Sequence, residues 1–141
     1  MGYRRELKEG YEGHYVFAEE GTENTLPGGQ TADEVHFDNY TNNHPWFVYD
    51  PETKKYSRFQ FGGPQIDELT GEQLTCDNIL VQYSDVTTYE GTTYKKIDTI
   101  TDGNGNSGGM GKYITRGKAI DIRWQKDSPW GITHYITMDN Q

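Results

Sequence analysis

The sequence predicts an all-β fold, either a sandwich or a partly closed barrel of about eight or nine short, mostly antiparallel strands. Short runs rich in aromatic and β-branched residues recur along the chain, with turn signals roughly every eight to twelve residues. No segment repeats apolar residues at helical spacing for three turns, and the region from Leu69 to Leu74 has room for one helical turn at most.

The clearest predicted element is a hairpin over residues 45–61. Its first strand, Trp46 to Tyr49, is apolar on both faces, which predicts a position between two layers. Pro51 presets the backbone for a turn, and Asp50 can accept the backbone N–H two residues further on. These residues are the ones around which we expect the rest of the chain to be organised.

Other strands are predicted from alternation or from compact apolar runs, at residues 14–18, 34–38, 79–83, 96–100, 113–115, 118–125 and 132–138. In the second of these, Val35 should face the core and His36 the solvent. The run 79–83 has the composition of an interior strand. Residues 116–118 predict a tight turn, and residues 85–93 an exposed hairpin turn. Residues 14–141 are expected to form a single β-rich domain after a flexible lead-in, or former linker, over residues 1–13.

Composition excludes several classes of function. A chain of 141 residues is about one domain, and its formal net charge of −9 argues against a surface for nucleic acid or anionic lipid.

The single cysteine, Cys76, cannot form an internal disulfide, and its acidic neighbour Asp77 should raise the pKa of the thiol, which predicts a buried, inert residue. No run is long and apolar enough to span a membrane, and because the printed sequence does not open on a charged-then-apolar leader, no export signal is expected within it.

The stretch from Asp102 to Gly111 is rich in glycine and asparagine and is predicted to be an irregular connection. It lacks the Gly-Lys-Ser/Thr of a phosphate-binding loop. As a calcium loop it has alternating oxygens at Asp102, Asn104 and Asn106, but Ser107 stands where a glycine belongs and Tyr113 where a glutamate belongs.

No metal and no cofactor are predicted, because the four histidines have no ligand-like spacing with one another or with Cys76. No nucleophile motif is present. Asp67, Glu72 and Asp77 follow the hairpin and could form a carboxylate pair for glycoside hydrolysis, but acids in turns are also expected for backbone capping. Trp130, in a predicted turn, is the aromatic residue most exposed to a ligand.

From about Phe17 to Met138 the chain resembles the C-terminal domain of the YerB-like family of bacterial lipoproteins, a domain of unknown function. The resemblance is most specific at Tyr49-Asp50, Tyr56 to Arg58, Asp67, Thr70 to Leu74 and Asn78 to Val81, and continues at Gly109 to Gly111, Ile122 to Trp124 and Lys126. Such proteins are secreted and lipid-anchored and have an additional N-terminal domain. The resemblance implies that this chain is a fragment of a longer lipoprotein and that its lipid anchor lies outside the chain. The resemblance also implies a closing glycine-and-tryptophan strand after Gln141, beyond the printed sequence, so this sequence does not define what covers one sheet edge.

The resemblance brings no catalytic residue with it. We take Tyr56, Arg58, Asp67, Asn78 and Trp130 as candidate binding residues. The polar members also have a structural interpretation, in which Arg58 pairs with Asp67 and Asn78 caps a turn.

Three hypotheses follow for the function. The first is a non-catalytic, extracytoplasmic binding or scaffolding domain of a cell-envelope lipoprotein, with a wall component, an envelope protein or the N-terminal domain as partner. The second is a carbohydrate- or peptidoglycan-binding module, or a carbohydrate-active enzyme. It requires a groove holding two carboxylates about 5–10 Å apart beside an aromatic residue. The third is a purely structural β-domain.

Overall fold

The computed structural model describes residues 18–139. The predicted lead-in and residues 14–17 of the first predicted strand lie outside this range. Within it the fold is all-β, with twelve strands and no helix, so the predicted class is confirmed. The count exceeds the eight or nine predicted because three strands have two residues each, too few to produce a periodic pattern.

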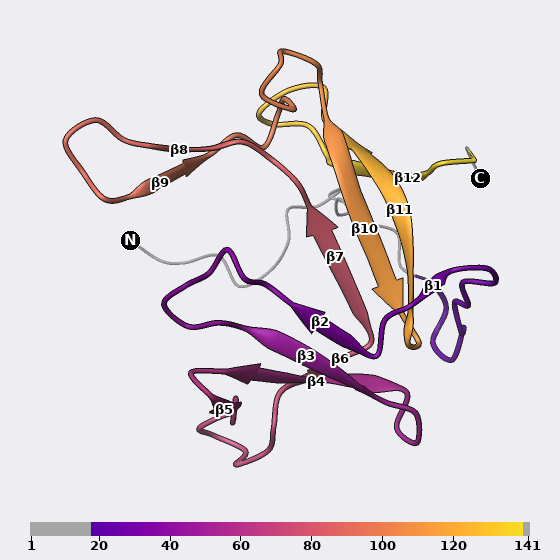
Figure 1. Cartoon of the computed structure of the whole chain (residues 1–141). Coiled ribbons are helices and arrows are strands. Elements are labelled where there is room, and N and C mark those ends of the chain that lie inside the picture. Colours follow the sequence, from indigo (N-terminus) through magenta and orange to yellow (C-terminus); the bar gives the residue numbers. More distant parts are fainter. Residues whose placement is uncertain (1–17, 140–141) are drawn as a thin grey trace, which may run out of the picture.

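Two five-stranded sheets form the body (Figure 1). Sheet A runs in the order β1 (Gln30–Thr31), β11 (Lys118–Gln125), β10 (Gly109–Thr115) and β7 (Asn78–Gln82), with β12 (His134–Thr137) also paired to β11. Sheet B runs in the order β2 (Glu34–His36), β3 (Trp46–Asp50), β4 (Lys55–Gln60) and β5 (Gly63–Pro64), with β6 (Thr75–Cys76) also paired to β4. All strand pairs in the described range are antiparallel, and neither sheet closes into a barrel.

A third, two-stranded sheet extends from the end of β7. It consists of β8 (Val86–Thr88) and β9 (Lys95–Ile97), and Figure 1 shows it extending away from both larger sheets. We call residues 86–97 the arm. The exposed hairpin turn predicted within residues 85–93 is therefore confirmed, and the strand predicted at residues 96–100 is β9, which ends at Ile97.

The predicted central hairpin is β3–β4. Asp50 accepts the backbone N–H of Glu52 at 2.8 Å and the hydroxyl of Thr53 at 2.9 Å, as its position before Pro51 predicts. The first strand does not lie between two layers, however. Phe47 and Tyr49 pack on the core, whereas Trp46 stacks on its cross-strand neighbour Phe59, with ring centroids 4.9 Å apart. The apolar residues on the outer face pack along the sheet itself.

The core lies between the two sheets. Sheet A contributes Ile79, Ile114 and Ala119, sheet B contributes Tyr56, and Ala32 comes from the link between β1 and β2. The predicted tight turn after β10 is Arg116-Gly117, with φ of 52° and 71°. A Cβ on Gly117 would also lie 2.9 Å from the ring of Tyr49, so the turn needs glycine for conformation and for space.

Two predictions for sheet A are wrong. The run 79–83, expected in the sheet interior, is an edge strand, because β7 pairs with β10 alone and Leu80 is exposed. The glycine-rich stretch is irregular only as far as Gly108. Gly109 to Gly111 begin β10, where a Cβ on Gly111 would collide with the Val81 carbonyl oxygen of the neighbouring strand. Glycine is used there to let two strands approach.

Candidate functional site

The chain passes twice between the sheets, once at Ala32-Asp33 and once at Asp77, and both passages lie beside Tyr56. The Tyr56 side chain is fully buried, at 0% exposure. Its hydroxyl donates to the Ala32 carbonyl at 2.9 Å and accepts the Gly117 N–H at 3.0 Å. We call Ala32, Tyr56, Asp77, Thr115 and Gly117 the junction.

Burial raises the pKa of Tyr56 to about 12, since the phenolate would have to form without water. Thr115 is also buried and donates its hydroxyl to the Asp77 carbonyl at 3.1 Å. Because every polar group of these two side chains has a partner, the junction fixes one sheet against the other and leaves no group there to receive a ligand.

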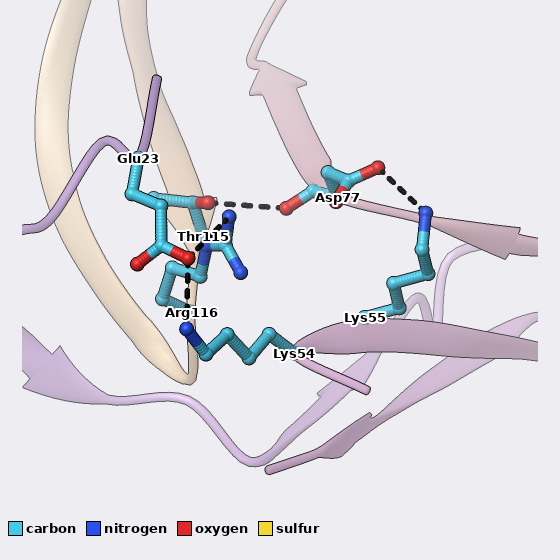
Figure 2. A network of polar contacts seen from close by, with 6 residues as sticks. All are labelled: Glu23, Lys54, Lys55, Asp77, Thr115 and Arg116. Carbon is cyan, nitrogen blue, oxygen red and sulfur yellow. Dashed lines mark hydrogen bonds and ion pairs between the residues drawn. The ribbon is translucent and has the colours of Figure 1, made fainter. Parts of the chain in front are cut away.

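Charged side chains surround the junction at the ends of the hairpins (Figure 2). Lys54, from the β3–β4 turn, donates to Glu23 at 2.7 Å, and the Arg116 guanidinium of the β10–β11 turn lies 3.8 Å from the same carboxylate oxygen. Lys55 donates to Asp77 at 3.1 Å. The network thus ties the segment before β1 to one turn of each sheet, but the pairs are about half exposed and add little stability.

The carboxyl groups with a shifted pKa in the described range are all shifted downward. The Lys54 ammonium lowers the pKa of Glu23, and backbone N–H groups lower those of Asp50 and Asp67. Hydroxyl and amide donors of Thr101 and Asn106 do the same for Asp98 and Asp102. These groups are ionised at neutral pH, so none of the five is a general acid held in its protonated form.

Cys76 is half-buried at the end of sheet B. Burial, and then the Asp77 carboxylate, raise the pKa of its thiol, which is the direction predicted from the sequence. The thiolate is disfavoured at neutral pH, as in a cysteine that serves packing. No group of three or more histidine, cysteine or carboxylate side chains within residues 18–139 is arranged to hold a metal ion.

The candidate binding residues do not converge on one site. Arg58 donates to Gln65 and not to Asp67, and its guanidinium lies 5.9 Å from the ring centroid of Phe47. Asp67 instead accepts the backbone N–H groups of Leu69 and Thr70, both at 2.9 Å. The predicted pairing of Arg58 with Asp67 is therefore wrong, since the carboxylate is used by its own turn.

Asn78 does not cap a turn either. It lies in β7, and its side-chain oxygen accepts the hydroxyl of Tyr113 on the neighbouring strand at 2.8 Å. Tyr56 is enclosed in the junction, out of reach of a ligand. Trp130, in the link from β11 to β12, is 91% exposed, so it is the one candidate whose side chain is presented almost entirely to solvent.

The glycine-rich loop is ordered by Asp102. Its carboxylate accepts the backbone N–H groups of Asn104 and Asn106 at 2.9 and 3.2 Å and the side-chain amide of Asn106 at 2.8 Å. The carboxylate oxygens of Asp102 are thus engaged within the loop, in the manner of an ordinary turn.

A cavity of about 530 Å³ lies at the edge of β11, a volume within the range of small-molecule sites. Leu26, Pro27 and Met138 supply apolar walls. The charged residues of its lining include Lys112 and Asp121, which bind each other at 2.5 Å. Their charges are therefore already neutralised before any ligand enters.

The arm is an exposed surface of the described residues that sequence reasoning missed. Val86 and Ile97 are paired on one face, and Tyr89 and Tyr94 lie on the other, all more than half exposed. A two-stranded sheet has no interior in which to bury such side chains. The alternation was visible in the sequence, but the lack of a covering layer was not.

Another exposed surface lies where β4 leads through β5 to β6. Phe61, Ile66 and Leu69 are exposed there beside Asp67, Glu68 and Glu72, and we call residues 61–72 the acidic tip. Leu69, at its apex, is 96% exposed. Both surfaces are of the kind that proteins use for contact with other molecules.

Within residues 18–139 there is no helix with the length and apolar character of a membrane span. None of the curated proteins compared with the chain matches it. Among solved structures, the crystal structure of the YerB protein from Bacillus subtilis is similar, with a TM-score of 0.52 and 21% sequence identity over 65% of this chain. The match covers 32% of that protein, and at this identity it concerns the fold alone.

The family model for the C-terminal domain of DUF3048, a protein of unknown function, matches residues 34–141. This range includes every strand from β2 onward. The predicted resemblance to YerB-like proteins is confirmed, and the chain belongs to the family of DUF3048 C-terminal domains.

Proposed function

We propose that this chain is a non-catalytic binding or scaffolding domain that acts outside the cytoplasm as part of a cell-envelope lipoprotein. The resemblance given in the sequence analysis supports the location and the link to a lipid-anchored protein. The lowered pKa values of the carboxyl groups also support a non-catalytic role. A carboxyl with a lowered pKa is ionised at neutral pH, so it can accept hydrogen bonds in a turn but has no proton to donate to a substrate.

The observation that carries the proposal is the exposed arm. Its tyrosine, valine and isoleucine side chains stand on a hairpin that has no core of its own, and so contribute little to folding. Tyrosine is also among the residues enriched where proteins contact one another. We expect the arm to be the surface through which the domain binds its partner.

A pull-down from envelope extract tests this proposal, with the domain as bait. A Tyr94→Ser/Ile97→Ser variant should lose a partner that the unmodified domain captures. Tyr40→Ser is the matched control, because Tyr40 is also more than half exposed but lies between β2 and β3, outside the arm. Capture that is equal in all three baits would contradict the assignment to the arm, and turnover of a substrate by the domain would contradict a non-catalytic role.

A second candidate is a carbohydrate-binding module that recognises peptidoglycan, and the exposure of Trp130 favours it. An indole presented to solvent can stack on a sugar ring. Sedimentation with purified peptidoglycan, weakened by Trp130→Ala and unchanged by the arm variant, would replace the first proposal with this one.

A further inference from the structure

The two exposed apolar surfaces of this chain have opposite charges. The arm contains two lysines and one glutamate, whereas the acidic tip contains three carboxylates and no basic residue. The protein as a whole has a net charge of −9, so the arm is a basic element on an acidic molecule. This difference is the first reason to consider the two surfaces together.

The arm presents apolar side chains beside a lysine on each face. Val86 pairs with Ile97 on the face that bears Lys95, and the opposite face combines Lys96 with Tyr89 and Tyr94. The ion pairs of the described residues include neither lysine. Lys95 donates only a long hydrogen bond to the Thr88 hydroxyl, at 3.4 Å, and Lys96 lies near enough to Asp98 to help lower the pKa of that carboxyl. Both ammonium groups lie on the exposed arm, where carboxylates from another molecule can reach them.

The acidic tip is a firmly held projection. Asp67 accepts two backbone N–H groups with its carboxylate, its own N–H donates to the Glu72 carbonyl at 2.8 Å, and its carbonyl accepts the Gly71 N–H at 2.9 Å. These bonds hold Leu69 at the apex, with Glu68 and Glu72 close by in the same turn. The described ion pairs include neither glutamate.

The two surfaces have complementary charges. Each has a small group of exposed apolar side chains, and the lysines of one have the opposite sign to the glutamates of the other. Figure 1 places the arm and the β5 region well apart in one molecule, so a single copy does not close this contact on itself.

We propose that the arm of one copy of this chain docks on the acidic tip of a second copy. The idea rests on the proposed function, because it names a partner for the same arm. Since the two surfaces are different, the contact is head-to-tail, and each copy keeps one free arm and one free tip from which an assembly can grow. Apolar burial supplies the attraction, and the charges set the pairing.

The experiment measures the sedimentation of the whole chain over a wide range of concentration. The average mass should rise with concentration, and added salt should reduce the association. The arm variant Lys95→Glu/Lys96→Glu and the tip variant Glu68→Lys/Glu72→Lys should each weaken self-association by about tenfold or more, because like charges then face each other. All four side chains lie outside the described ion pairs, so circular dichroism and Tm should be unchanged.

Mixing the two variants gives the decisive result. The tip variant retains a normal arm and the arm variant retains a normal tip, and the reversed arm is likewise complementary to the reversed tip, so the mixture should regain association, with the two variants alternating. A protein with all four substitutions should regain self-association, since both charges are then reversed. Self-association of the tip variant by itself would instead indicate arm-to-arm contact and overturn the proposal.

A chain that stays monomeric at every concentration also overturns this inference. The proposed function survives that outcome if the pull-down still depends on Tyr94 and Ile97. If the chain self-associates but all baits capture the envelope partner equally, the arm-to-tip contact stands and the assignment of envelope binding to the arm fails. The arm then serves assembly of the domain alone.

Discussion

Tyr56 at the junction and Tyr94 in the arm are the same type of residue in contrasting surroundings. Tyr56 is enclosed, with a hydroxyl that both donates and accepts a hydrogen bond. Tyr94 is 75% exposed, and its backbone carbonyl accepts the Tyr89 N–H at 3.1 Å to close the end of the hairpin. The side chain of Tyr56 packs inside the fold and helps to hold it together, whereas the side chain of Tyr94 is exposed to solvent.

The difference separates residues that hold this fold from residues available for function. Where two sheets and two crossings of the chain meet, a side chain gains apolar burial and fixed hydrogen bonds. Where a hairpin stands alone, the same side chain gains little from the folded state. A change at the junction should therefore alter stability, and a change in the arm should alter association.

The largest effect is expected from Tyr56→Ala. Removal of a fully buried ring typically lowers the free energy of unfolding by about 3–5 kcal/mol. The change also leaves the Gly117 N–H and the Ala32 carbonyl without the phenol. Urea unfolding followed by circular dichroism measures the loss. Tyr56→Phe, which keeps the ring, should lose about 1–3 kcal/mol, and an equal loss for both variants would show that the hydroxyl dominates.

Alkaline pH offers a second way to test the junction. The pKa of Tyr56 is raised from 10.0 to about 12, so the unfolded chain releases this proton at lower pH than the folded protein. Stability from this group is complete below pH 10 and is lost as pH rises toward 12, by about 2–3 kcal/mol in all. In Tyr56→Phe the decline between pH 10 and 12 should be shallower, and an unchanged slope would place its origin in the other tyrosines.

Gly111→Ala tests the close approach of β10 and β7 beside the junction. The added methyl group would collide with the Val81 carbonyl oxygen, so we expect a loss of about 1–3 kcal/mol in the free energy of unfolding. Gly105→Ala is not a matched control, because Gly105 has a φ of 90°. Gly63→Ala is better, since that residue has free space around it and an ordinary φ. Equal losses in the two variants would contradict the role of close packing.

Features of the fold that depend on residues close together in the sequence could be predicted from the sequence. The Asp50-Pro51 turn and the Arg116-Gly117 turn depend on nearby residues, and both were predicted correctly. The alternation in Glu34 to His36 and in Lys118 to Gln125 also gave strands in the right places.

Strand order and the partners of side chains depend on residues far apart in the sequence, and these could not be predicted. The composition of residues 79–83 fits an interior strand, but which strand occupies the edge depends on the order of pairing. The sequence places Arg58 and Asp67 on either side of a turn, but the backbone N–H groups of Leu69 and Thr70 are the closer partners of that carboxylate. Likewise Trp130 was correctly expected to be exposed, whereas Tyr94 was not distinguished from tyrosines that pack.

The smallest effect on folding is expected in the arm. Tyr94→Ser and Ile97→Ser remove exposed side chains and should each change the free energy of unfolding by no more than about 0.5 kcal/mol. The same substitutions should weaken self-association, because the apolar groups that the acidic tip covers are gone. Urea unfolding at a concentration where the chain is monomeric separates the two effects. If the arm variants lose as much stability as Tyr56→Phe, the arm packs on the domain itself, and its exposed side chains are not kept for another molecule.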